Sequence, residues 1–223
     1  MLTTKVVSNK KPPLLSDSES GGSTSLKLKG NDYMLQVYTG NGKGKTTAAI
    51  GLAIRSLGAD KKVYFCQFMK TLAYSEQAIL QKFAPQLKLT TSGKPYFIAK
   101  EGMLTDEEIK KWGDMLQVYP EGKPPKDYVK LVNDSLKNLL EEINNTHYDL
   151  IILDEINVAM YYDLITKETL EFVLNQIPSD IEIVCTGRYA PQWLCERADL
   201  VTDMQEVKHY YQQGLQGRKG IED

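Results

Sequence analysis

Met34 to Gly58 have the sequence MLQVYTGNGKGKTTAAIGLAIRSLG, which combines an apolar run, a glycine-rich turn and a helical pattern. The apolar run predicts a strand over Leu35–Tyr38, and the small and apolar residues after Thr46 predict a helix. Strand, glycine-rich turn and helix in this order are typical of a phosphate-binding loop. The glycines let backbone N–H groups converge on phosphate oxygens, and the helix N-terminus adds the positive end of its dipole. Lys45 can reach the terminal phosphates, and the Thr46 hydroxyl can bind Mg²⁺.

The loop is shorter than the usual pattern, which has four residues between its first glycine and the Gly-Lys-Thr. Here only the three residues from Asn41 to Lys43 separate Gly40 from Gly44. The alternative to a nucleotide site is a glycine-rich turn that binds no ligand. The predicted phosphate-binding residues of the loop and helix start are Gly40, Asn41, Gly42, Lys43, Gly44, Lys45, Thr46 and Thr47.

A second diagnostic stretch, Tyr148–Glu155, is an apolar strand run that ends in two acids. A carboxylate at the tip of a buried strand can bind Mg²⁺ directly or through water when a phosphate loop lies beside it. The predicted ligands of Mg²⁺ (or Mn²⁺) are Thr46, Glu155 and Asp154. Taken alone, the stretch is also compatible with a strand that ends in a solvated Asp-Glu turn. The two motifs together favour a nucleotide site, because each predicts the other.

Composition argues against several other classes of protein. The chain has 223 residues and a formal net charge of −2, which gives no reason to expect nucleic acid or a membrane surface as a partner. Residues Met1 to Asn31, rich in Ser, Lys, Gly and Pro, predict a disordered or partner-docking arm, and residues 32–223 predict a single domain. The cysteines lack metal-ligand or redox spacing, and there is no apolar signal segment. We expect a cytoplasmic protein, with Cys66 and Cys185 as small core residues.

Strands and helices alternate along the chain, which predicts an α/β fold with a mostly parallel sheet and helices on both faces. Lys70 follows the predicted strand Val63–Phe68, and Arg188 follows the predicted strand Ile181–Thr186. Open α/β sheets bind ligands at the carboxyl ends of their strands. Both side chains are therefore expected to bind ATP phosphates, with a solvated loop lysine and a surface arginine as the alternatives.

The segment between Gly93 and Pro125 predicts loops around one helix. Gly93–Ile98 is expected to be a loop that carries aromatic residues. Thr105–Glu108 forms a capping box, which opens a helix through Trp112. The turn residues of Tyr119–Pro125 predict a second loop.

Several short motifs occur together in one order and resemble a known family. They are Gly40–Thr47, Gln67-Phe68 with Lys70, Leu153–Glu155, Thr186–Arg188, Ala198–Val201, Lys208-His209, Gly214 and Gly220–Glu222. This set resembles the ATP:corrinoid adenosyltransferases of the phosphate-loop type, which act on cob(I)alamin or cob(I)yrinic acid a,c-diamide. The shortened loop is that family's own version. The resemblance covers about Met34 to Glu222 and implies a phosphate-loop NTPase (RecA-like) architecture.

The resemblance implies a particular reaction. The Co(I) of a reduced corrinoid attacks the 5′ carbon of ATP, a cobalt–carbon bond forms and triphosphate leaves. Since cobalt is the nucleophile, the protein has to position the 5′ carbon and stabilise the leaving triphosphate. Lys45, Thr46 and Glu155 are the expected catalytic residues. The resemblance further implies a homodimer, and we add a flavoprotein reductant as an expected partner.

The chain departs from the family after Gly93, where members carry Phe and Trp that cover the corrinoid. Here the segment is Lys94-Pro-Tyr-Phe97, so Tyr96 and Phe97 are the local candidates for the corrinoid contact, and ordinary packing of a loop is the alternative. Two other functions stay open from the residues. An ordinary ATPase or kinase would release single phosphate with water or another acceptor. A non-catalytic ATP-binding module would turn over nothing.

Overall fold

The computed structural model describes residues 34–215 and 217–222, so the predicted N-terminal arm lies outside the described residues. Its main element is a six-stranded sheet in the order β3-β2-β6-β7-β1-β8, and all neighbouring strands in it are parallel. The predicted fold class, an α/β fold with a mostly parallel sheet, is thereby confirmed. The strands are β1 (Leu35–Thr39), β2 (Val63–Phe68), β3 (Leu87–Ser92), β6 (Leu150–Asp154), β7 (Glu182–Thr186) and β8 (Leu200–Asp203).

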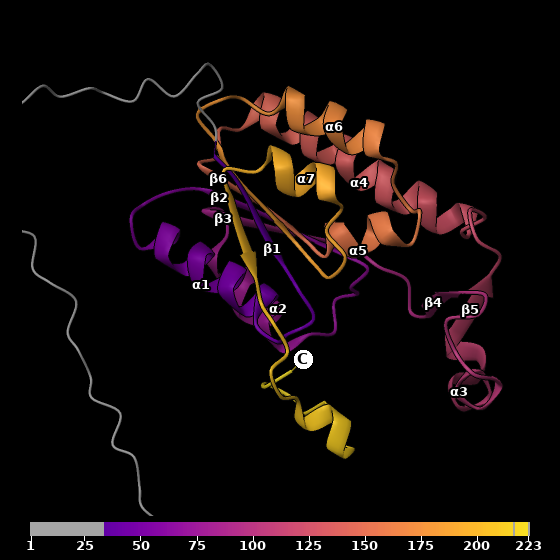
Figure 1. Cartoon of the computed structure of the whole chain (residues 1–223). Coiled ribbons are helices and arrows are strands. Elements are labelled where there is room, and N and C mark those ends of the chain that lie inside the picture. The colour runs from indigo at the N-terminus through magenta and orange to yellow at the C-terminus, as the bar shows by residue number, and fades with distance from the viewer. Residues whose placement is uncertain (1–33, 216, 223) are drawn as a thin grey trace, which may run out of the picture. The chain divides into compact units, whose positions relative to one another are not determined.

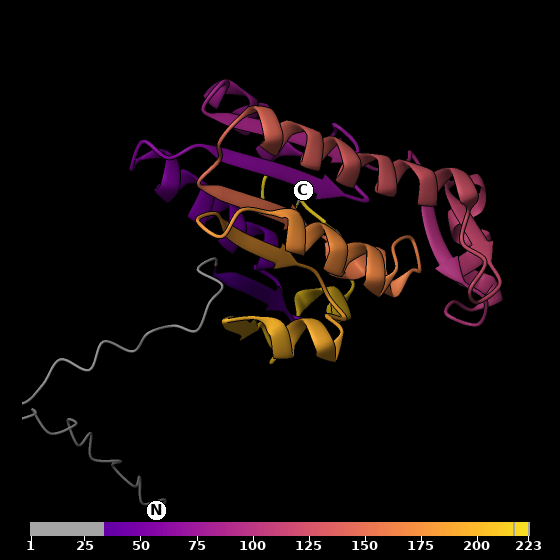
Figure 2. The same ribbon diagram turned by 90° about the horizontal axis from the view of Figure 1, so that it is seen from above.

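Helices cover both faces of this sheet (Figures 1 and 2). One face is covered by α1 (Lys45–Leu57) and α2 (Ser75–Leu80), whose buried residues pack in one apolar cluster with Phe65 and Val184. The other face carries α4 (Lys126–Asn145), α5 (Ile156–Tyr161), α6 (Lys167–Gln176) and α7 (Gln192–Arg197).

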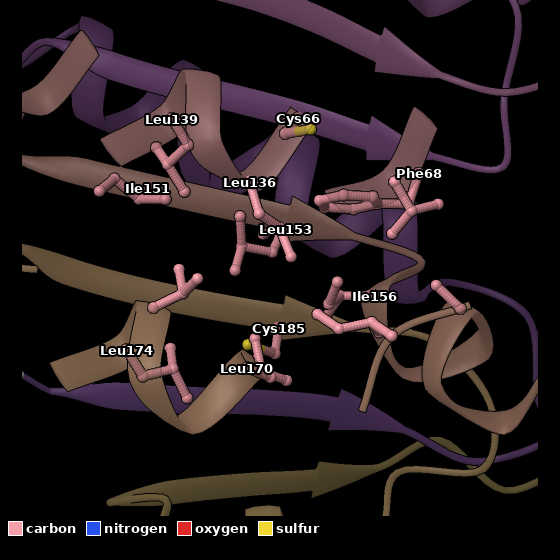
Figure 3. Packing of buried hydrophobic residues seen from close by; sticks show 14 of the residues in the cluster. Cys66, Phe68, Leu136, Leu139, Ile151, Leu153, Ile156, Leu170, Leu174 and Cys185 are labelled. Atoms are coloured by element: carbon pink, nitrogen blue, oxygen red, sulfur yellow. The ribbon is translucent and has the colours of Figure 1, made fainter. Parts of the chain in front are cut away.

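The larger core lies between the sheet and the second group of helices. Figure 3 shows Leu136 and Leu139 of α4 and Leu170 and Leu174 of α6 pointing toward the strands, with Leu153 between them. Cys66 and Cys185 are buried in it as small core residues, as the sequence predicts, and both are free thiols. Central parallel strands are covered on both faces, which explains why β2 and β6 are buried at every position.

A second, two-stranded parallel sheet lies to one side of the first (Figure 1). It pairs β4 (Phe97–Lys100) with β5 (Leu116–Tyr119), and α3 (Asp106–Trp112) connects them. The loops predicted at Gly93–Ile98 and Tyr119–Pro125 are therefore wrong where they overlap these strands. Each strand has only four residues and pairs across a helix, so no local pattern marks it.

Among the described residues, no helix is both long and apolar enough to cross a membrane.

Candidate active site

A cleft of about 750 Å³ opens at the carboxyl ends of β1, β2, β6 and β7. Small-molecule sites are typically of this size. The phosphate loop forms its floor from Gly42 to Thr47, and Lys70, Glu155 and Arg188 line its walls. Four segments that are distant in sequence thus converge on one site, as the sequence predicts.

The first part of the loop packs against the chain that follows β8. A Cβ added at Gly40 would lie 2.2 Å from Asp203 Oδ1, and one added at Gly42 would lie 2.6 Å from the Met204 carbonyl oxygen. Gly40 also has a φ of +94°. The Gly42 N–H donates to that Met204 carbonyl at 2.6 Å, so this amide is occupied. The amides left to receive a phosphate are those of the later loop and of the first turn of α1, which helix geometry leaves unpaired.

Lys45 is buried at the start of α1 and bends back over the loop. Its Nζ donates to the carbonyl oxygens of Gly40 and Gly42, at 2.7 Å each. Burial, followed by the nearby Arg188, lowers the pKa of Lys45. The ammonium group thus lies on the cleft floor, where a phosphate oxygen could replace a carbonyl as its partner.

Asp154 ends β6 as a fully buried carboxylate and does not line the cleft. Its Oδ1 accepts hydrogen bonds from the hydroxyls of Thr46, at 2.9 Å, and Thr186, at 2.6 Å. Its Oδ2 accepts from Gln67, at 3.1 Å, and from Lys70, at 3.0 Å. Four donors compensate the burial of this charge. Its place is behind Thr46, so a role in holding Thr46 fits the geometry better than direct contact with a metal.

Glu155 lines the cleft, beside the loop. Its backbone is left-handed, with φ 64° and ψ 18°, and it forms the N-cap of α5. Burial, and then the charge of Asp154, raise the pKa of Glu155 to about 7, although Lys70, Lys45 and Arg188 act in the opposite direction. A cation placed beside such a carboxyl group would stabilise its ionised form.

Lys70 belongs to a polar network between β2 and α2. Burial alone would lower the pKa of Lys70, but Asp154 outweighs it and the pKa is raised. Gln67 Nε2 donates to Glu76 Oε1 at 3.0 Å, and Gln77 Nε2 donates to Gln67 Oε1 at 2.8 Å. Lys70 is thus held by two acids, which does not fit the alternative of a solvated loop lysine.

Arg188 reaches the loop from β7. Its Nη2 donates to the Asn41 carbonyl at 3.3 Å, and the side chain lines the cleft. The next residue, Tyr189, also lines the cleft and stacks on Tyr161, with ring centroids 4.1 Å apart. Arg188 therefore lies beside the phosphate loop, where the sequence analysis expected it.

Other predicted site residues lie elsewhere. Gly40 and Asn41 precede the part of the loop that lines the cleft. Tyr96 packs edge-on against Tyr128, and Phe97 against Trp112, on the β4–β5 side of the molecule. Neither aromatic lines the cleft, so their contact with a corrinoid stays a prediction.

The sequence reasoning assigned no role to several residues of the cleft walls. Tyr74, Ile79 and Tyr162 line it from α2 and the end of α5, and His209, Ile221 and Glu222 line it from the C-terminal segment. Motif order pointed to Lys208-His209 and Gly220–Glu222 without a role for them. No local pattern distinguishes the others from ordinary surface residues.

The comparisons with known proteins agree with the geometry. The family described as ATP:corrinoid adenosyltransferase BtuR/CobO/CobP matches residues 31–222. A corrinoid adenosyltransferase of Sinorhizobium sp. is 29% identical over 194 residues, which are 85% of this chain and 79% of that protein. One from Escherichia coli (strain K12) is 29% identical over 187 residues, 83% of each chain.

Among solved structures, a KaiC-like protein from the archaeon Pyrococcus horikoshii has 14% identity and a TM-score of 0.42, and the match covers 80% of this chain and 75% of that one. A likeness of this size adds nothing to the assignment. The family match spans all of the described residues, including every segment that lines the cleft. The chain belongs to the ATP:corrinoid adenosyltransferase family.

Proposed function

We propose that this chain transfers the 5′-deoxyadenosyl group of ATP to the Co(I) of a corrinoid in the cleft above the phosphate loop, and that triphosphate leaves. One observation supports this most strongly. In a member of this family, Lys45, Glu155 and Arg188 meet the loop in a single cleft. The arrangement supplies cationic groups and amides for a triphosphate. Neither histidine has an acidic or nucleophilic partner at catalytic spacing in the sequence.

The roles follow from where each group lies. Lys45, Lys43 and Arg188, with the amides at the start of α1, would stabilise the negative charge that grows on the triphosphate as the bond to the 5′ carbon breaks. Lys70 would hold the Asp154 carboxyl in place through its hydrogen bond. Because the corrinoid supplies the nucleophile, Glu155 has no proton to remove in this step.

Magnesium is the cation that we propose for the nucleotide. No cluster of three or more His, Cys, Asp or Glu side chains suited to a metal exists in the described part of the chain. Mg²⁺ usually needs only one or two protein oxygens when phosphates and water supply the rest. The Thr46 hydroxyl and the Glu155 carboxylate both line the cleft and fit that donor set. When bound, the ion would offset the charge of the triphosphate.

The decisive experiment mixes the protein with Mg-ATP and chemically reduced corrinoid under anaerobic conditions. We expect the spectrum of a light-sensitive alkylcobalt product and one intact triphosphate per product formed. Lys45→Ala should lower turnover by at least about 100-fold. Lys82→Ala, which changes an exposed lysine outside the cleft, is the control. The absence of alkylcobalt product from the unaltered protein would refute the proposal.

The same experiment separates the other two functions. An ATPase or kinase would release single phosphate whether or not reduced corrinoid is present. A non-catalytic module would bind ATP and yield neither product.

A homodimer, a cytoplasmic location and a flavoprotein reductant belong to the same proposal. The family resemblance supports the homodimer, and composition supports the location. Light scattering of the purified chain tests the first of these.

A further inference from the structure

The backbone of Glu155 has a conformation that glutamate rarely adopts. Its φ of 64° lies in the left-handed region, which is unfavourable for a residue with a side chain. Such a conformation persists only where the surroundings hold it. Two contacts do so. The Glu155 N–H donates to Thr186 Oγ1 at 3.0 Å, and the Glu155 carbonyl accepts from Ala159 N–H at 3.1 Å.

The hydroxyl of Thr186 makes a second hydrogen bond, to the other acid of the pair. It donates to Asp154 Oδ1 at 2.6 Å. Because the Glu155 amide can only donate, the oxygen of Thr186 must accept there and give its single proton to Asp154. Thr186 is fully buried and does not line the cleft. It therefore acts on the site through these two neighbours.

Asp154 Oδ1 is also the atom to which Thr46 donates, at 2.9 Å. One path of three hydrogen bonds thus runs from the Glu155 amide through Thr186 and Asp154 to the Thr46 hydroxyl. Its two ends belong to Thr46 and Glu155, the two cleft residues whose side-chain oxygens are proposed above for the cation. Backbone pairing already fixes β6 beside β7, and the path adds side-chain hydrogen bonds that tie the start of α1 to the ends of these two strands.

The turn after Thr186 is fixed from the same side. Asn157 Nδ2 donates to the Gly187 carbonyl at 3.1 Å, and the Gly187 N–H donates to the Tyr38 carbonyl at 3.1 Å. Gly187 has a φ of +131°, and a Cβ there would lie 3.1 Å from Asn157 Cβ. The turn that follows Thr186 is therefore held in place, and with it the end of β7 that carries the Thr186 hydroxyl.

We propose that Thr186 is a positioning residue whose hydroxyl sets the spacing between Thr46 and Glu155 for a divalent cation on the bound nucleotide. The inference rests on the proposed role of magnesium. Outer partners of this kind typically change metal affinity by about 10- to 100-fold when removed. A valine at this position keeps the shape of threonine and loses both hydrogen bonds.

The test measures cation binding apart from turnover. Mn²⁺ is titrated into the complex of enzyme and ATP and followed by electron paramagnetic resonance, for the unaltered protein, Thr186→Val and Thr186→Ser. We expect Thr186→Val to weaken Mn²⁺ binding by at least about tenfold. ATP binding in EDTA should stay within about twofold, because the path does not touch the amides of α1. Thr186→Ser, which keeps the hydroxyl, should stay within about threefold of the unaltered protein.

Thr90→Val is the matched control, since Thr90 is a strand threonine whose hydroxyl donates to Tyr64 at 3.3 Å, away from the cleft. It should not change Mn²⁺ affinity. If Thr186→Val does not fold, Thr186→Ala carries the same expectation. Unchanged Mn²⁺ affinity in Thr186→Val, or a loss of Mn²⁺ affinity in Thr186→Ser equal to that in Thr186→Val, overturns the inference. Absence of Mn²⁺ binding by the unaltered complex would instead overturn the proposed metal role, and the inference with it.

Discussion

Asp154 carries its charge in a fully buried position, where two hydroxyls, an amide and an ammonium group donate to it. A buried carboxylate loses its hydration, and these donors replace it. The ammonium group of Lys70 is the only cation among the four. The Lys70 side chain is only 13% exposed, so dissolved salt screens the Lys70–Asp154 pair little. If one partner is removed, water cannot replace it as it would at a surface.

The buried pair predicts that both single variants are destabilised and that their effects are strongly coupled. Asp154→Asn leaves Lys70 facing an amide, and removing one partner of a buried pair typically costs about 3–5 kcal/mol. Lys70→Met leaves the carboxylate with three neutral donors and should also destabilise the protein. In the double variant the loss should be smaller than the sum, by about 0.5–3 kcal/mol. Urea unfolding of the four proteins measures this, and additive losses would mean that the pair contributes nothing.

The sequence predicted that Asp154, which ends β6, and Glu155, which follows it, both belong to the site, and the structure brings both to the loop. It could not predict which acid faces the cleft. Strand alternation would point Asp154 and Glu155 to opposite faces, but the left-handed backbone at Glu155 re-aims that side chain. This conformation depends on Thr186, which lies 31 residues further along the chain. A contact of that separation has no local signature.

Gly40 of the loop and Gly51 of α1 should respond in opposite ways to replacement by alanine. Gly51 lies inside α1, and a Cβ added there would meet nothing within 4 Å. Gly51→Ala should therefore stabilise the protein by about 0.5–1 kcal/mol, through helix propensity. Gly40→Ala should destabilise it by more than about 1 kcal/mol, because φ is +94° and Asp203 occupies the space. Thermal unfolding of both variants gives the comparison, and equal effects would contradict it.

The C-terminal end of α4 is held to the sheet by an acid with two partners. Glu142 accepts from Lys88 of β3 and, at 2.7 Å, from Tyr148 Oη. These bonds, that from Lys88 first, lower the pKa of Glu142. A carboxyl with a lowered folded-state pKa adds stability above its unfolded pKa of about 4.3, and the addition is lost as pH falls through the folded value.

Glu142→Gln should therefore be less stable than the unaltered protein at pH 7, and the difference should shrink as pH falls below the unfolded pKa of about 4.3 and through the lowered folded-state pKa. Urea unfolding at a series of pH values measures it. Glu141→Gln, at the exposed neighbouring position, is the control and should show no such trend. A stability difference that stays constant with pH would show that the charge of Glu142 does not cause it.

Among the strands and helices, the long and periodic ones were predictable from the sequence and the short ones were not. The continuous apolar runs of β2 and β6 and the apolar face of α4 each have a strong local pattern. β4 and β5 have four residues each and exist because they pair with one another across α3. Tyr119 illustrates this. Its place in a loop followed from the proline after it, but its Oη donates to the Tyr162 carbonyl at 2.7 Å and holds β5 to α5.

For the whole molecule, the cleft unites segments from both ends of the described chain. The loop follows β1 at the start, whereas His209, Ile221 and Glu222 come from the end. A ligand in the cleft therefore binds only when these parts are folded together. Such a ligand stabilises the folded protein by about 2.7 kcal/mol when its concentration is 100 times its dissociation constant.

This linkage distinguishes what the loop recognises. If the amides of α1, Lys45 and Arg188 hold a triphosphate, then Mg-ATP and inorganic tripolyphosphate should both raise the melting temperature in a concentration-dependent way. AMP, which carries the adenosyl group without the two outer phosphates, should raise it far less. Lys45→Ala should lose most of the rise with tripolyphosphate, since the ammonium group on the cleft floor is absent. Equal stabilisation by AMP and ATP would show that the adenosyl part supplies the affinity, and would contradict a loop that holds triphosphate as the leaving group.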